Sequence, residues 1–120
     1  MDSKTTIQEL KEKIKKFCED RDWDQHHNAK ELTVGMIIEV SELLEHFRFK
    51  SKEEVDEMFK NEKREEIAGE IADILHFLLR LAQRYNIDLT TELNKKMEEN
   101  DKKYPIDKIK GKKYRKYTEI

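Results

Sequence analysis

Apolar residues recur at every third or fourth position through much of the chain, and this spacing predicts amphipathic helices. Near the N-terminus, Ile7, Leu10, Ile14 and Phe17 would form one stripe on a helix over residues 5–20. Apolar spacing also predicts helices over residues 29–48 and 62–85, and capping residues indicate two more, over residues 52–59 and 89–102. No stretch reads as a strand, and the low content of 3 Gly and 1 Pro favours long helices. We therefore expect an all-α protein, a bundle of four to five helices.

Residues that begin and end helices support these boundaries. The candidate N-caps are Thr6 and Ser51, each in a capping box with the Glu three residues later, and Asn28, Asn61 and Asp88. The polar stretch DRDWDQHHN, residues 20–28, is expected to be a loop. Pro105 would end the last helix, because proline cannot continue one. The basic segment 106–120 that follows shows no clear periodicity.

The length of 120 residues indicates one domain, which we place at residues 1–105, followed by the basic tail 106–120. Hydrophobic residues make up 36% and charged residues 43% of the chain, so the core should be thin. Small helical proteins of this kind often complete their core by association through a helix face. We expect a homo-oligomer, either a dimer or a tetramer.

Charge and cysteine usage exclude several classes of protein. The 27 acidic and 25 basic residues nearly cancel, so no stable nucleic-acid partner is expected. No apolar run is long enough to span a bilayer, and none resembles a signal peptide, so no membrane association is expected. A single cysteine, Cys18, forms no internal disulfide and fits a reducing compartment. These features predict a cytoplasmic protein.

Two acidic pairs interrupt the apolar arcs of the second and fourth predicted helices. Glu39 and Glu42 are three residues apart, as are Glu70 and Asp73, so each pair shares one helix face. In a chain this acidic, one such pair is usually a solvated surface. Two pairs displaced into apolar arcs would repel one another and lose solvation unless a cation joined them. Mg²⁺ prefers oxygen ligands, so the four acids predict a magnesium site, with Mn²⁺ as a possible substitute.

The same acids allow two other interpretations. A helical interaction module, whose acidic faces pair with Lys or Arg of a partner, remains an alternative without catalysis. A di-iron bundle usually requires two Glu-x-x-His pairs, and the second predicted helix supplies none. The chain also lacks a P-loop, so phosphates would be bound through metal and side chains.

Together with these acids, three segments resemble the all-α nucleoside triphosphate pyrophosphohydrolases, the MazG-like enzymes, which include the dCTP pyrophosphatases. RDWDQHHNAKEL, residues 21–32, is similar to W-x-x-x-H-x-P-K-N-L, and EVSELLEHFRF, residues 39–49, is similar to E-V-G-E-L-A-E-x-F-Q-W. KKMEENDKKYP, residues 95–105, is similar to K-M-x-x-N-x-x-R/K-Y-P. The resemblance therefore covers about residues 20–105.

The resemblance implies a fold, a reaction and a set of site residues. The four acids would hold Mg²⁺, and water would attack the α-phosphorus of a nucleoside triphosphate to give the monophosphate and pyrophosphate. The implied phosphate- or sugar-binding residues are Lys96, Asn100, Lys30, Lys103 and Tyr104. The implied base-binding residues are Trp23, His27, Phe49 and Phe77. The substrate would be dCTP or a related pyrimidine, with dUTP, modified nucleotides or all nucleoside triphosphates as alternatives. Such an activity would clean the nucleotide pool.

Overall fold

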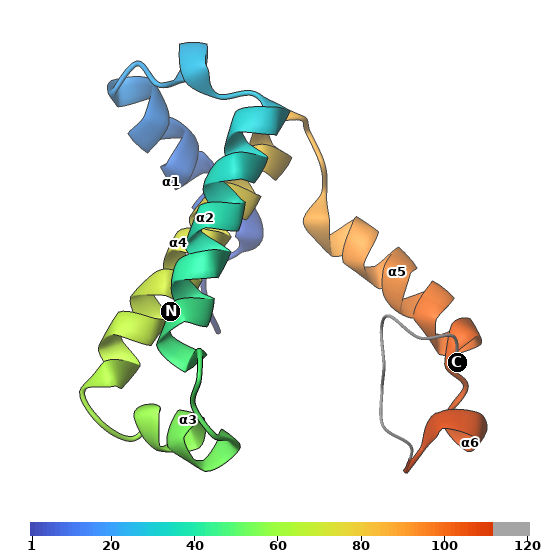
Figure 1. Cartoon of the computed structure of the whole chain (residues 1–120). Coiled ribbons are helices and arrows are strands. Elements are labelled where there is room, and N and C mark those ends of the chain that lie inside the picture. Colours follow the sequence, from blue (N-terminus) through green and yellow to red (C-terminus); the bar gives the residue numbers. More distant parts are fainter. Residues whose placement is uncertain (112–120) are drawn as a thin grey trace. The chain divides into compact units, whose positions relative to one another are not determined.

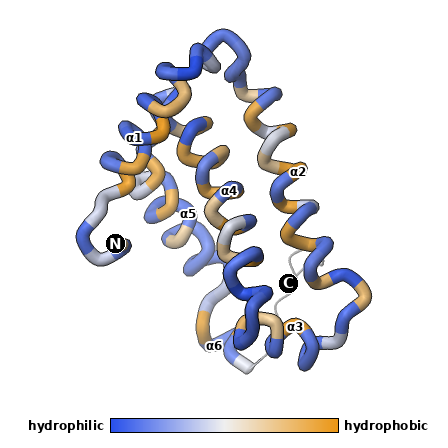
Figure 2. The backbone as a smooth tube through the Cα atoms, turned by 90° about the vertical axis from the view of Figure 1, so that its left-hand side faces the viewer, coloured by the Kyte–Doolittle hydropathy of each residue, from blue (hydrophilic) through white to orange (hydrophobic). Residues whose placement is uncertain are grey.

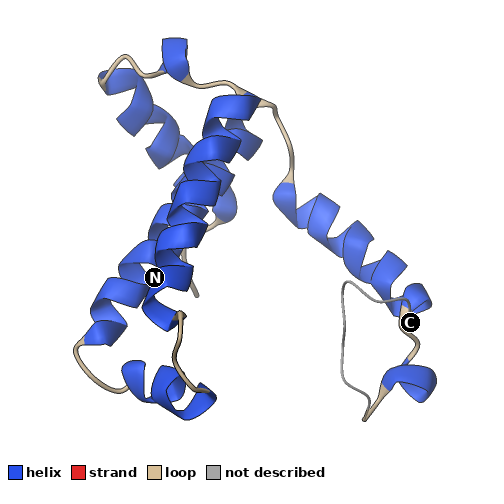
Figure 3. Ribbon diagram, in the orientation of Figure 1, coloured by secondary structure: helices blue, strands red, loops and turns tan. Residues whose placement is uncertain are grey.

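The structure is a computed structural model that describes residues 1–111. The helices are α1 (Ile7–Asp20), α2 (Ala29–Phe47), α3 (Lys52–Met58), α4 (Lys63–Arg84), α5 (Leu89–Lys103) and α6 (Ile106–Ile109), with a short 3₁₀ turn η1 (Asp24–His26). Figure 3 shows helices and loops, and residues 1–111 contain no strand. The expected all-α fold is therefore confirmed.

Most helix starts follow the side chains that the sequence indicated. Thr6 and Ser51 each close a capping box, and the side chains of Asn28 and Asp88 accept backbone N–H groups of α2 and α5. At α4, Glu62 takes the N-cap position, whereas Asn61 Oδ1 accepts the N–H of Lys63 at 2.9 Å. Local hydrogen bonding thus sets these boundaries.

The chain divides into two compact units, and the first is Met1–Asn86. In this unit α2 lies alongside α4, and α1 also packs against α4 (Figures 1 and 2). Among residues 1–111 six apolar residues are buried, and all belong to this unit: Cys18, Leu32, Met58, Ile67, Leu79 and Ala82. Helix α4 is therefore the central element of this unit and contributes half of that core.

Much of the apolar surface of α2 and α4 stays exposed. The exposed apolar residues are Val34, Ile37, Ile38, Val40 and Leu44 on α2, and Ile71, Leu75 and Leu78 on α4. Packing within the first unit leaves all of these residues exposed. These exposed apolar residues are consistent with association between copies of the chain. The homo-oligomer stays a prediction.

The second unit begins at Ile87, and its described part contains α5 and α6. Helix α5 ends at Lys103, before Pro105 as expected, because proline disfavours a helical residue before it. Helix α6 was not predicted, since a four-residue helix is too short to show a period. Residues 112–120 of the tail lie outside the described part. The boundary expected at residue 105 stays a prediction.

Across residues 1–111, none of the helices combines the length and the apolar composition that crossing a bilayer requires.

Candidate metal centre

Three of the four predicted acids converge between α2 and α4. Glu39 comes from α2, and Glu70 and Asp73 come from one face of α4. Each offers a carboxylate oxygen, and these oxygens lie within 4.8 Å of one another. The packing of α2 against α4 brings the two acidic pairs together, because three-residue spacing keeps each pair on one side of its helix.

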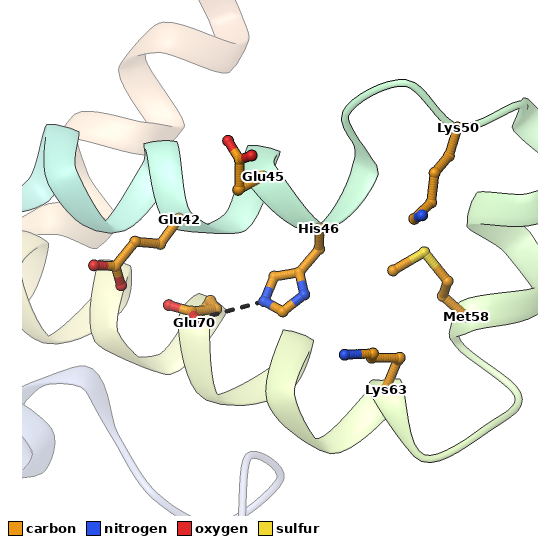
Figure 4. Close-up of a pocket in the computed structure, with 7 residues that line it drawn as sticks. All are labelled: Glu42, Glu45, His46, Lys50, Met58, Lys63 and Glu70. Atoms are coloured by element: carbon orange, nitrogen blue, oxygen red, sulfur yellow. Dashed lines mark ion pairs between the residues drawn. The ribbon is translucent and has the colours of Figure 1, made fainter.

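The fourth acid, Glu42, lies at the edge of this cluster. Its charge and a hydrogen bond shared with Glu39 both raise the pKa of Glu39, so the two carboxyls are close neighbours. Figure 4 shows the Glu42 and Glu70 side chains beside one another, from adjacent helices. The structure thus gathers all four residues, with Glu42 outside the group of three oxygens.

The electrostatics of Glu39 fit a cation. Burial raises its pKa most, and the charges of Glu42, Asp73 and Glu70 raise it further. Its Oε2 atom is buried, and none of the residues that the structure describes gives that atom a hydrogen bond. A buried, unpartnered oxygen in an all-carboxylate cluster is costly for the protein alone, whereas a hard divalent cation would satisfy it. The donor set therefore fits Mg²⁺ or Mn²⁺.

Next to the acids is an open cavity of about 450 Å³ at the α3 end of the helix pair. Its lining residues are Glu42, Glu45, His46, Lys50, Met58, Lys63 and Glu70 (Figure 4). His46 Nε2 lies 3.5 Å from Glu70 Oε1 and connects the acidic and basic sides of the cavity. The sequence reasoning missed His46, Lys50 and Lys63, although Lys63 is two helical turns before Glu70 and so shares its face.

Two of the predicted base-binding aromatics belong to a chain of ring contacts at the other end of the helix pair. The Trp23 ring meets Phe17 edge to face, with ring centroids 5.6 Å apart. The Phe17 ring contacts His76, which contacts Phe77. Trp23 is 40% exposed, so one part of its surface is open to a ligand.

Phe77 packs against the backbone of α2 at Gly35. A β-carbon added at Gly35 would lie 2.5 Å from the Phe77 ring, which is too close for any side chain there. Glycine therefore allows this ring to approach the helix.

His27 is held by a buried arginine that the sequence reasoning did not single out. Arg80 is 1% exposed, and its Nε donates to Nδ1 of His27 at 3.0 Å. Its two terminal nitrogens donate to Gln83 Oε1 at 2.6 Å and to the carboxylate of Asp24. Burial lowers the pKa of His27, and the Arg80 charge lowers it further, so the imidazole is neutral near pH 7. Arg80 thus fixes the loop that carries Trp23 and His27.

Phe49 lies elsewhere. It is 90% exposed, has a φ of 62°, and has the Arg48 guanidinium 4.6 Å from its ring centroid. It follows the C-terminal end of α2, whereas Phe77 contacts Gly35 near the start of that helix. At 1.5 Å per residue, these two regions of α2 are about 18 Å apart. Phe49 and Phe77 of one chain therefore do not form a single wall, and the role of Phe49 stays a prediction.

Four of the predicted phosphate- or sugar-binding residues belong to the second unit. Lys96 pairs with Glu99 at 3.3 Å, and the Lys103 ammonium lies 5.5 Å from the Tyr104 ring centroid. The Asn100 carbonyl accepts the N–H of Tyr104. The fifth, Lys30, is exposed in the first turn of α2. Their contacts to a nucleotide stay predictions.

Comparisons with known proteins agree with the resemblance. The sequence model of the MazG-like family matches residues 35–120, which include all four acids of the cluster. The chain is 32% identical to bovine dCTP pyrophosphatase 1 over 119 residues, covering 98% of this chain and 70% of that protein. It is 31% identical to the human dCTP pyrophosphatase 1 over 116 residues, covering 96% of this chain and 68% of the human protein.

A solved structure supports the fold as well. A pyrophosphatase from Archaeoglobus fulgidus matches with a TM-score of 0.78 and 37% identity, covering 82% of this chain and 92% of that chain. These relatives support the enzyme class expected from the sequence, a nucleoside triphosphate pyrophosphohydrolase. The chain belongs to the MazG-like family.

Proposed function

We propose that this chain is a Mg²⁺-dependent pyrophosphohydrolase whose substrate is a pyrimidine deoxynucleoside triphosphate, with dCTP the first choice. The observation that carries the proposal is the carboxylate cluster, in which Glu39 keeps a buried, unpartnered oxygen beside Glu70 and Asp73. The choice of dCTP is supported by relatives that are themselves named dCTP pyrophosphatases.

Glu39, Glu70 and Asp73 would hold the metal, with Glu42 beside them. A bound divalent cation neutralises phosphate oxygens and lowers the pKa of a coordinated water. The carboxylates themselves would concentrate negative charge between α2 and α4, which attracts the cation and orients water. Mn²⁺ fits the same oxygen ligands and should substitute for Mg²⁺.

In the reaction, the oxygen of a water forms a bond to the α-phosphorus, and the bond from that phosphorus to the α,β-bridging oxygen breaks. Pyrophosphate leaves with the electron pair, and the nucleoside monophosphate is the second product. Glu42 is the acid proposed to accept the proton of the water, because it lies at the edge of the cluster rather than among the three convergent oxygens. A positioned carboxylate is a suitable general base for this step.

The base would be bound at the end of the helix pair where Trp23, His27 and Phe77 lie. An apolar slot with a few fixed polar groups is the usual form of such a site. The neutral His27 imidazole, held by Arg80, supplies the polar group. Lys96 and Asn100 are proposed to reach the phosphates or sugar, with Lys30, Lys103 and Tyr104 as further candidates. The exposed apolar faces of α2 and α4 support a homo-oligomeric enzyme.

The test is to incubate the protein with Mg²⁺ and each nucleoside triphosphate, and to resolve the products by chromatography. Monophosphate plus pyrophosphate is expected, fastest from dCTP. Glu39→Gln and Asp73→Asn should each lower kcat by about a hundredfold or more, since even neighbours of metal ligands often cost 10- to 100-fold. Glu57→Gln is the matched control, because Glu57 pairs with Lys60 on the surface of α3.

Two results would contradict the proposal. Nucleoside diphosphate plus phosphate as products would exclude attack at the α-phosphorus. An absence of turnover with every triphosphate and with both Mg²⁺ and Mn²⁺ would favour the non-catalytic interaction module instead.

A further inference from the structure

The cavity beside the acids has one acidic and one basic side, and its charges are arranged in order. Glu42 and Glu70 belong to the carboxylate cluster, and Glu45 pairs with Arg48 at 3.6 Å. Figure 4 shows the Lys50 and Lys63 side chains on the side away from Glu42. The basic side therefore has two ammonium groups, with His46 between them and the acids.

The two lysines come from different elements and are available to a ligand. Lys50 lies in the loop between α2 and α3, where its charge helps to lower the pKa of Glu54, but within residues 1–111 its ammonium forms no ion pair. Lys63 Nζ lies 3.2 Å from Glu66 Oε2, but both side chains are about half exposed, at 48% and 59%. Surface pairs of this kind are weak, so an incoming phosphate can replace Glu66.

Lys63 is also an unusual residue for a helix N-terminus. It is the first residue of α4, where the helix dipole favours anions and disfavours a cation. A lysine there opposes the local rule, and such exceptions concentrate at functional sites. An anion bound at this end would be attracted both by Lys63 and by the helix terminus.

One face of α4 carries an aromatic, an acidic and a basic region in that order, which is the order of ligands expected for a base, an α-phosphate and the outer phosphates. Phe77 is followed toward the N-terminus by the acids Asp73 and Glu70, and then by Lys63. At 1.5 Å per residue, Phe77 is about 6 Å from Asp73 along the axis, and Lys63 is about 10 Å from Glu70. A base at the aromatic end and an α-phosphate at the acids would direct the remaining phosphates toward the lysines.

We propose that this cavity is the subsite for the β- and γ-phosphates, and that Lys50 and Lys63 hold them before and after the α,β bond breaks. The ligand of the cavity is thus pyrophosphate, first as part of the substrate and then as the leaving group. This inference rests on the proposed function, because it assumes that the acids receive the α-phosphate. It uses only residues of the first compact unit.

The experiment measures binding of inorganic pyrophosphate, with Mg²⁺ present, by calorimetry. Lys50→Gln and Lys63→Gln should each weaken pyrophosphate binding by about tenfold, the usual scale for losing a charge-assisted hydrogen bond. Binding of the nucleoside monophosphate should stay within about twofold. The double variant Lys52→Gln/Lys60→Gln is the matched control, because both residues pair on the surface of α3 and its end, outside the cavity.

Turnover gives a second reading. The double variant Lys50→Gln/Lys63→Gln should show a raised KM for the triphosphate and weaker product inhibition by pyrophosphate, with inhibition by the monophosphate unchanged. If the wild type hydrolyses triphosphates but the double variant keeps wild-type pyrophosphate affinity, the subsite assignment is wrong and the proposed function stands. If the wild type hydrolyses no triphosphate, the proposed function fails and this assignment fails with it.

Discussion

Replacing Arg80 by methionine tests how the loop between α1 and α2 is held. The guanidinium is 1% exposed and donates to His27 Nδ1, Gln83 Oε1 and the Asp24 carboxylate. Methionine keeps most of the apolar stem of the side chain but removes all three donors. His27 would then lose this hydrogen bond to α4, and Asp24 would keep only its 4.0 Å contact with Arg84.

The magnitude follows from these contacts. Hydrogen bonds that involve a charged group contribute about 1.5–3 kcal/mol each, and removal of one partner of a buried pair costs about 3–5 kcal/mol. The Asp24 side chain is 39% exposed and keeps Arg84 at 4.0 Å, so water and a second cation reduce the loss. We expect Arg80→Met to lower the free energy of unfolding by about 3 kcal/mol, the lower end of the buried-pair range.

Urea denaturation followed by circular dichroism, at one protein concentration, measures this change as a lower midpoint with an unchanged slope. Arg84→Met is the matched control, because Arg84 is 36% exposed and only at the limit of an ion pair with Asp24. Its effect should stay below about 1 kcal/mol. Equal losses in the two variants, or a midpoint of Arg80→Met within error of the wild type, would refute the assignment of Arg80 as the support of this loop.

Three further predictions concern packing and titration in the first unit. Gly35→Ala should lower the free energy of unfolding by about 1–3 kcal/mol, because the added methyl overlaps the Phe77 ring. Gly69→Ala is the control: open space surrounds Gly69, so this variant should raise the free energy of unfolding by up to about 1 kcal/mol, and thermal melts compare the two. Burial lowers the pKa of His27, so as the pH falls the unfolded chain binds a proton at His27 before the folded protein does. The melting temperature should therefore fall as the pH drops below about 6.5, and it should fall less in His27→Gln. Burial raises the pKa of the Cys18 thiol, and Cys18 is 0% exposed, so a thiol reagent should label it only after urea unfolds the protein; rapid labelling of the native protein would contradict the structure.

Features that depend on neighbours in sequence could be predicted. The capping boxes at Thr6 and Ser51 involve residues three apart, and the acidic pairs rely on the same spacing. Once the two acidic helices were assumed adjacent, the cluster followed from the helical repeat alone. The helical period does not depend on the rest of the fold, so the caps and the acidic cluster could be predicted from the sequence.

Features that depend on distant contacts could not be predicted. Arg80 meets His27 and Asp24 across 53 and 56 residues, and nothing near Arg80 in the sequence marks it as buried. A helical wheel also cannot decide which of two apolar faces of a helix is buried, and Val40, within the apolar pattern of α2, is 46% exposed. Lys50 joins the cavity only because the α2–α3 turn brings it there, and helical spacing does not describe that loop.

The unpartnered oxygen of Glu39 has an evolutionary consequence. A carboxylate held among three others weakens the metal-free protein, so under the proposed function Glu39 would be retained for turnover at the expense of stability. Selection for heat resistance alone, without selection for catalysis, should therefore favour neutral replacements at Glu39 early. A lineage that had lost the need for this activity would be expected to lose this acid before the apolar residues around it.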